Sequence, residues 1–397
     1  MNTSLLNIFL TFLKLGCISF GGPVSHLSFF YRDLVVHRQL IDEKTYVDLV
    51  ALCQSLPGPA SSQVAISIGM KQQGLAGGIA AILGFILPSI GIMIFAGYAI
   101  NFFTAQAQSL WLHGFKVAVA AVIAQAIVQM SQRFLIGIIH ILIAVTAAII
   151  ATIFVSFAGQ IGAILIGVVV GKLLIQQSHA SELPITNPDK GIISTRTAII
   201  AWILFFVLLF GLPFINAGLN NHSLSLFNSF YRTGALVFGG GHVILPLLES
   251  QVVMSGWVDN NTFLTGYGIA QAVPGPLFSF AGFLGTVTKG VPHGWPGGLF
   301  CVFAIYLPSI LILVGIMPIW EKWRQHQAFQ SILAGVSAAV VGLLIAAFYD
   351  PIWVATIQSS TDLIIAMTAF LFLQHLRWPQ WLIVLLCVLG ELLIQYI

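Results

Sequence analysis

The sequence predicts an all-α, polytopic membrane protein built from two related halves. Of its 397 residues, 58% are hydrophobic and only 7% are charged, and the mean hydropathy is +0.99. A water-soluble domain carries about a quarter charged residues on its surface, so this composition excludes one. Repeated glycine and proline motifs, together with the distribution of Lys and Arg, predict two inverted-topology repeats with roughly 9 to 13 membrane segments.

A membrane-spanning helix needs about 20 predominantly apolar residues. We expect ordinary spans at residues 75–100, 109–130, 134–155, 158–176, 197–216, 294–317, 329–349, 361–376 and 379–396. Other apolar stretches are interrupted by Gly and Pro near their middle, at residues 5–36, 44–70, 227–249 and 262–288. These interrupted stretches predict broken helices.

The motifs of the first half return in the same order in the second half. Phe20-Gly21-Gly22-Pro23 corresponds to Phe238-Gly239-Gly240-Gly241, Gln54 with Pro57-Gly58-Pro59 corresponds to Gln271 with Pro274-Gly275-Pro276, and Leu87-Pro88-Ser89 corresponds to Leu307-Pro308-Ser309. The near-constant spacing indicates a duplication. The predicted domains are a first membrane repeat (1–176), a polar cytoplasmic linker (177–196), a connecting transmembrane helix (197–216) and a second membrane repeat (217–397).

Lys and Arg side chains are retained in cytoplasmic loops. Lys71, Arg133 and the cations of the linker mark every second loop of the first half, whereas loop 217–226 has no Lys or Arg and is expected outside. The second repeat therefore starts on the opposite side from the first, as in many secondary transporters. The broken stretches are either re-entrant hairpins that enter from opposite faces or full crossings, which would give about thirteen spans.

The breaks lie at membrane depth, where unpaired backbone groups cost several kcal/mol unless protein or water covers them. A new helix that starts at such a break presents free N–H groups, which favour an anion. Four breaks in two matching pairs therefore predict an anion site where they meet; the alternative is that Gly and Pro only kink packed helices. Lys14 and Arg232 occupy equivalent positions and could flank the anion, or each could extend to a membrane interface.

The predicted substrate-binding residues gather at these breaks. They are Lys14, Phe20, Gly21, Gly22, Pro23, Gln54, Pro57, Gly58, Pro59, Arg232, Gly239, Gly240, Gly241, His242, Gln271, Pro274, Gly275 and Pro276. His26, Lys116 and Glu249 are candidates for the transport pathway or for proton coupling, because imidazole titrates near neutrality and charges inside spans usually serve a pathway. The alternative interpretations are that His26 is only a hydrogen-bonding residue, that Lys116 extends to the membrane interface, and that Glu249 is a loop residue.

Other function classes find no support in the sequence. Lys and Arg form no basic tract for nucleic acid, and Cys17, Cys53, Cys301 and Cys387 lack the pairwise spacing of a metal or redox site. Motifs of hydrolases, zinc proteases and P-loop proteins are absent from the sequence. We therefore expect no catalytic residues, no metal and no cofactor; the expected partners are an oxyanion and the lipid bilayer, and a homodimer is left open.

The motifs listed above, with His26, His242, Gly335 to Ala339 and Val340 to Tyr349, resemble the chromate ion transporter family in its long, two-domain form. This resemblance implies a protein of the bacterial inner membrane that exports chromate, coupled to the proton motive force. Rival hypotheses are a transporter of sulfate or molybdate, which share the shape and charge of chromate, and a passive anion channel. A membrane enzyme acting on a lipid-linked phosphate is disfavoured by the lack of acids that would bind a metal.

Overall fold

The computed structural model describes residues 4–100, 105–175, 193–219, 221–238, 241–320 and 326–394, and every regular element among them is helical. The first half contains α1 (Leu5–Ile18), α2 (Gly22–Phe30), η1 (Tyr31–His37), α3 (Glu43–Ser55), α4 (Ala60–Ala99), α5 (Ala105–Phe134), α6 (Ile138–Ile153) and α7 (Phe157–Leu174). A connecting segment follows, with α8 (Thr195–Phe206), η2 (Val207–Gly211) and α9 (Leu212–Leu219). The predicted all-α class is confirmed.

The second half begins with α10 (His222–Leu236), η3 (Gly241–Val243), α11 (Ile244–Val252), α12 (Asn260–Ala272), η4 (Leu277–Ser279) and α13 (Phe280–Val287). It continues with α14 (Gly294–Ile316), η5 (Met317–Ile319), α16 (Gln327–Ala347), η6 (Phe348–Trp353), α17 (Val354–Thr356), α18 (Ser360–Gln374) and α19 (Gln380–Ile394). Most of the predicted linker, residues 177–192, lies outside the described residues, and α8 begins at Thr195.

A helix lies at each of the predicted ordinary spans, and the chain is a multi-pass membrane protein. Within the described ranges, five helices are long and apolar enough to cross a bilayer: Ala60–Ala99, His113–Phe134, Thr195–Asn216, Gly294–Ile319 and Gln327–Thr356. α6, α18 and α19 are apolar but have only 16, 15 and 15 residues, about 22 to 24 Å of helix. They are shorter than predicted because local signals set their ends, such as the capping box of Ser359 and Asp362 at the start of α18.

The interrupted stretches do contain breaks. The structure is non-helical between α1 and α2, between α3 and α4, between α10 and η3, and between α12 and η4, as far as these connections are described. Proline stands at several of the new helix starts: Pro23 in the first turn of α2, Pro59 at the N-cap of α4 and Pro276 at the N-cap of η4. Its fixed φ suits the beginning of a helix, where its missing N–H removes no helical bond.

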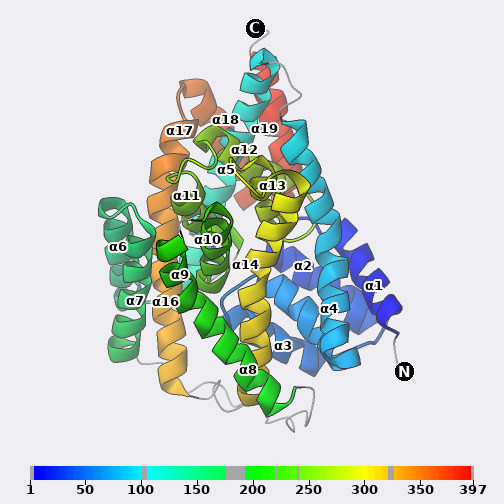
Figure 1. Cartoon of the computed structure of the whole chain (residues 1–397). Coiled ribbons are helices and arrows are strands. Elements are labelled where there is room, and N and C mark those ends of the chain that lie inside the picture. Colours follow the sequence, from blue (N-terminus) through cyan, green and yellow to red (C-terminus); the bar gives the residue numbers. More distant parts are fainter. Residues whose placement is uncertain are drawn as a thin grey trace.

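The 13-residue broken helices of the two halves, α3 and α12, lie toward opposite ends of the molecule. α3 is in the lower part of Figure 1 and α12 is in the upper part. α3 and α12 have 13 residues each, about 20 Å, which is less than the roughly 30 Å hydrocarbon core. These lengths favour re-entrant hairpins over full crossings.

The peripheral helix pairs are exchanged between the halves. α6 and α7 of the first half pack against α16 of the second half, while α18 and α19 pack against α5 of the first half. The long helices make the inner frame: α4 packs on α1 and α13, and α14 packs on α10 and α13 (Figure 1). The breaks are thus held inside a frame to which both halves contribute.

Candidate functional site

Two backbone hydrogen bonds join the Pro-Gly-Pro turn of each half to the break of the other half. The N–H of Gly58 donates to the carbonyl of Val237 with an N···O distance of 2.7 Å, and the N–H of Gly275 donates to the carbonyl of Ser19 at 2.8 Å. Ser19 and Val237 each directly precede the Phe-Gly-Gly motif of their half. The two bonds are therefore equivalent. They place the first turn (57–59) and the second turn (274–276) at the crossing of the two halves.

Glycine is required in both turns. Gly58 has φ of 117° and Gly275 has φ of 102°, a region that residues with a side chain rarely adopt. A Cβ built on Gly58 would overlap the hydroxyl of Ser309, and one built on Gly275 would lie 2.9 Å from Cβ of Ser89. Ser89 and Ser309 are the serines of the two Leu-Pro-Ser motifs, so each turn is closed against the long helix of the opposite half.

Further contacts complete a ring of four helix starts. The two backbone bonds join Ser19, which ends α1, to the turn before η4, and Val237, which ends α10, to the turn before α4. In addition, Nδ1 of His26 on α2 is 3.1 Å from the hydroxyl of Ser61 in the first turn of α4. A Cβ on Gly241 would lie 3.0 Å from Cδ1 of Leu277, so η3 lies against η4. Because helix starts carry partial positive charge, this ring (the crossing ring) concentrates positive potential inside the protein.

Buried polar atoms at the crossing ring lack hydrogen-bond partners. In the described part of the chain, these include Oγ of Ser19, Nε2 of His26, Oε1 of Gln63, both amide atoms of Gln271 and Oγ of Ser309. These side chains are at most 4% exposed. An unpaired buried polar group costs about 1 to 3 kcal/mol. A cluster of such groups is typical of a site that receives a polar ligand or water.

Comparison with known proteins decides the family. The sequence profile of the chromate transporters matches residues 6–175 and 224–392. The chain belongs to the chromate transporter family. Its relatives include an uncharacterized transporter of Methanocaldococcus jannaschii, 29% identical over 99% of this chain and 95% of the relative. They also include a chromate transport protein of Pseudomonas aeruginosa, 28% identical over 91% of this chain and 84% of the relative.

One relative is only half as long. An uncharacterized transporter of Bacillus subtilis is 29% identical over 185 residues, which are 44% of this chain but 99% of the relative. No solved structure matches the chain.

Within this family fold, the predicted motif residues of both turns lie at the crossing ring. Gly58 and Gly275 make its bonds, Gly241 packs on η4, and the prolines at 57, 59, 274 and 276 flank the two glycines. Residues 20–23 form the first-half break and the start of α2, and the ring of Phe20 lies 6.2 Å from that of Trp381 on α19. Gly239 and Gly240 lie outside the described residues.

The predicted basic pair, Lys14 and Arg232, lies on the two helices that precede the breaks. The side chain of Lys14 is exposed on α1, whereas Leu15 and Gly16 of the same helix are buried against α4. Arg232 is half-buried on α10, six residues before Phe238. A role for either side chain at an anion stays a prediction.

Sequence reasoning missed Arg133 as a site residue. The sequence indicates only a cation of a cytoplasmic loop at this position, but Nη2 of Arg133 donates to Oε1 of Gln54 at 2.7 Å. Gln54 lies at the end of α3, directly before the first turn. The repeated Gln before Pro-Gly-Pro pointed to Gln54 and Gln271, but no spacing in the sequence could bring in an arginine from α5.

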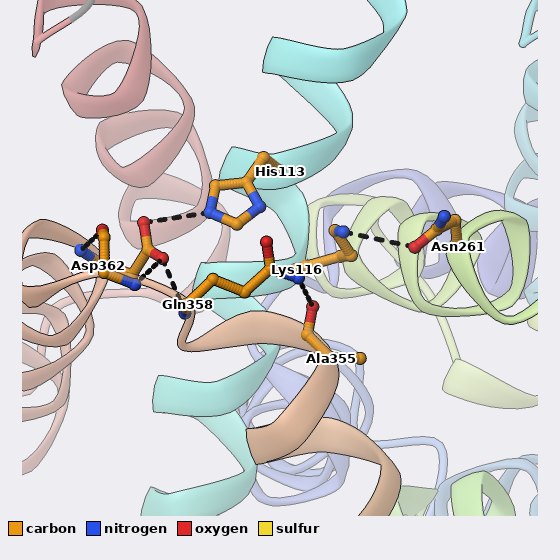
Figure 2. A network of polar contacts seen from close by, with 7 residues as sticks. His113, Lys116, Asn261, Ala355, Gln358 and Asp362 are labelled. Atoms are coloured by element: carbon orange, nitrogen blue, oxygen red, sulfur yellow. Dashed lines mark hydrogen bonds and ion pairs between the residues drawn. The ribbon is translucent and has the colours of Figure 1, made fainter.

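The three remaining candidates, His242, Glu249 and Lys116, have different neighbours. His242 is 3.0 Å, through Nδ1, from the hydroxyl of Tyr267, and Glu249 is half-buried on α11. Nζ of Lys116 donates to Oδ1 of Asn261 at 3.3 Å in a polar network (Figure 2). Lys116 and Arg133 are 17 residues apart on α5, about 25 Å along the helix, so Lys116 belongs to a different polar cluster from Gln54.

Proposed function

We propose that this protein is a secondary transporter that exports chromate from the bacterial cytoplasm across the inner membrane, driven by the proton motive force. The observation that carries the proposal is the pair of equivalent hydrogen bonds, Gly58 to Val237 and Gly275 to Ser19, because they assemble four helix starts around buried, unpartnered polar groups. Family membership and the chromate transport protein of P. aeruginosa support chromate as the substrate.

The crossing ring has the chemistry that a tetrahedral dianion requires. Each helix start contributes about 0.3 to 1 kcal/mol when exposed and up to about 2 kcal/mol when partly buried. Several starts must therefore act together to replace the hydration of a dianion. The hydroxyls of Ser19 and Ser309 and the imidazole of His26 would add hydrogen bonds without adding full charges.

Two inverted repeats would supply the alternating access. The matched motifs, the equivalent bonds and the half-length B. subtilis relative support a duplication. In transporters of this type, the two repeats exchange conformations around a central site and open it to one side at a time. Protons could be carried by His26, His242 or Glu249, which lie on helices that border the ring.

Transport into everted vesicles tests direction and coupling together. In such vesicles the cytoplasmic face is outside, so an exporter accumulates labelled chromate in the lumen when respiration supplies a proton gradient. We expect a protonophore to abolish accumulation, and vesicles without the protein to show none. Accumulation that persists with the protonophore would refute proton coupling, and accumulation only in right-side-out vesicles would refute export.

Sulfate or molybdate transport is the second candidate function, because the ring offers backbone and hydroxyl donors that fit any tetrahedral dianion. An excess of sulfate in the same vesicles separates the two candidates. If chromate is preferred by much more than tenfold, a tenfold excess of sulfate, about 1.4 kcal/mol of concentration advantage, leaves most chromate uptake intact. Unitary currents in a planar bilayer, without dependence on a proton gradient, would instead indicate a channel.

A further inference from the structure

A second polar cluster lies where α5, α18 and α19 pack together. It consists of His113 on α5, Asp362 on α18 and Glu391 on α19, and one possible ligand atom of each residue lies within 4.8 Å of the others. We propose that this cluster binds a divalent transition-metal ion such as Zn²⁺. The site is independent of the crossing ring and of chromate.

The residue types and spacing suit zinc. Zn²⁺ prefers imidazole and carboxylate ligands at about 2.0 to 2.2 Å in tetrahedral geometry, so its ligand atoms lie about 3.3 to 3.6 Å apart. Nε2 of His113 and Oδ1 of Asp362 are 2.9 Å apart, and a small outward movement of these side chains would admit the ion. Three protein ligands leave the fourth position for water.

The ligand atom of Asp362 is held in place by its surroundings. Its other oxygen, Oδ2, accepts hydrogen bonds from the backbone N–H groups of Gln358 and Ser359, both at 2.9 Å, which leaves Oδ1 facing His113 (Figure 2). Such outer contacts orient metal ligands in proteins. Asp362 is also only 4% exposed, so the surrounding protein restricts the movement of its side chain.

The independent observation comes from Glu391. Its Oε1 is buried and has no hydrogen-bond partner in the part of the chain that the structure describes. Two carboxylates this close repel each other unless a cation or proton lies between them. The two cationic side chains nearby have other partners: Nε2 of His113 is 2.9 Å from Oδ1 of Asp362, and the ammonium of Lys116 donates to Asn261 on α12 (Figure 2). A divalent ion would supply the missing partner.

Zinc binding by the purified full-length protein in detergent tests the proposal. We expect one Zn²⁺ per chain in competition with a chromogenic chelator, and at least about a tenfold weaker affinity in Glu391→Gln and in His113→Gln, since each removes one ligand. Asp362 is left unchanged because it also caps α18. His293→Gln is the matched control, since this exposed histidine contacts the carbonyl of Gly290, is not a member of the cluster and should leave the affinity unchanged.

A measurement on the unsubstituted protein tests the proposal even if the variants fail to fold. Loading with Co²⁺ in place of Zn²⁺ should give the visible absorption of a tetrahedral site, and added Zn²⁺ should displace it. The proposal is overturned if the protein binds no Zn²⁺ at about 100 μM, a free energy of about −5.5 kcal/mol. It is equally overturned if folded His113→Gln and Glu391→Gln proteins bind the ion as tightly as the original.

Discussion

The two halves contain the same hairpin in different surroundings. The first hairpin is α3, the turn at 57–59 and the start of α4; the second hairpin is α12, the turn at 274–276 and η4–α13. α3 and α12 have 13 residues each, but four are buried in α3 and eight in α12. α12 is covered by α5 and α19, whereas α3 packs mainly on α4.

This difference indicates that the contacts that form the site are distinct from the helices that control its exposure. Both turns have a glycine at positive φ and equivalent hydrogen bonds, so the crossing ring depends on glycine, proline and the opposite half. Exposure depends instead on the covering helices: Gln54 is exposed, but its counterpart Gln271 is only 4% exposed. The end of the first hairpin where α3 begins also carries Arg38, Lys44 and Lys71, the cations expected on the cytoplasmic side. We therefore expect this conformation to admit substrate from the cytoplasm.

Alanine in either turn should have the largest effect. Gly58→Ala and Gly275→Ala each place a Cβ at positive φ and against a serine of the opposite half, so we expect chromate accumulation in everted vesicles to fall by about tenfold or more. Gly91→Ala on α4 is the control, because a Cβ there meets open space. Loss of activity in one turn variant alone, with both proteins folded, would show that the two turns are not equivalent.

Cysteine labelling should expose the asymmetry of the hairpins directly. In a Cys17→Ser background, since the other cysteines are buried, Gln54→Cys should react with a membrane-impermeant thiol reagent about tenfold faster than Gln271→Cys in everted vesicles. Met254→Cys, 55% exposed on the loop expected outside, should react only in right-side-out vesicles. Equal rates at Gln54 and Gln271 would remove the inference that this conformation opens to the cytoplasm.

Removing the charge of Arg133 should have a smaller effect, confined to substrate capture. Arg133 donates to Gln54 at the exposed hairpin, so Arg133→Gln should raise the KM for chromate about three- to tenfold with little change in kcat, as expected for lost electrostatic attraction. Arg133→Lys should recover part of the loss. Lys172→Gln, at the end of α7, should leave KM unchanged. A fall in kcat alone would assign Arg133 to a conformational step instead.

The sequence predicted the breaks and the turns well, because glycine and proline act on the backbone of their own segment. Gly58 and Gly275 were identified by repetition, and both lie at the crossing. The sequence also indicates Ser19 as a hydroxyl near a break, but not the unpartnered Ser309 or the contact of Arg133 with Gln54, since these depend on how the halves pack. The unequal cover of the hairpins is also not predicted, because it arises from the packing of α5 and the exchanged helix α19 on α12.

The smallest effect is expected at the helix caps outside the membrane. Asp42 caps α3 by accepting from the N–H of Thr45, and Asp259 caps α12 by accepting from Thr262, both at 2.9 Å. Asp42→Ala should cost about 1 kcal/mol of stability, whereas Asp42→Asn, an equally good cap, should cost little. If the two caps are equivalent, Asp259→Ala and Asp259→Asn should change the stability by the same amounts as the corresponding substitutions of Asp42.

The cap of Asp42 also predicts a pH dependence with a defined sign. The hydrogen bonds from Thr45 hold the pKa of Asp42 below its usual value of 3.8. A carboxyl with a depressed pKa in the folded state contributes stability above its unfolded pKa and loses it as the pH falls through the folded value. The difference in melting temperature between the original protein and Asp42→Ala should therefore be constant above about pH 5 and shrink below about pH 4. A difference that grows on acidification would mean that the cap does not hold the ionised carboxylate.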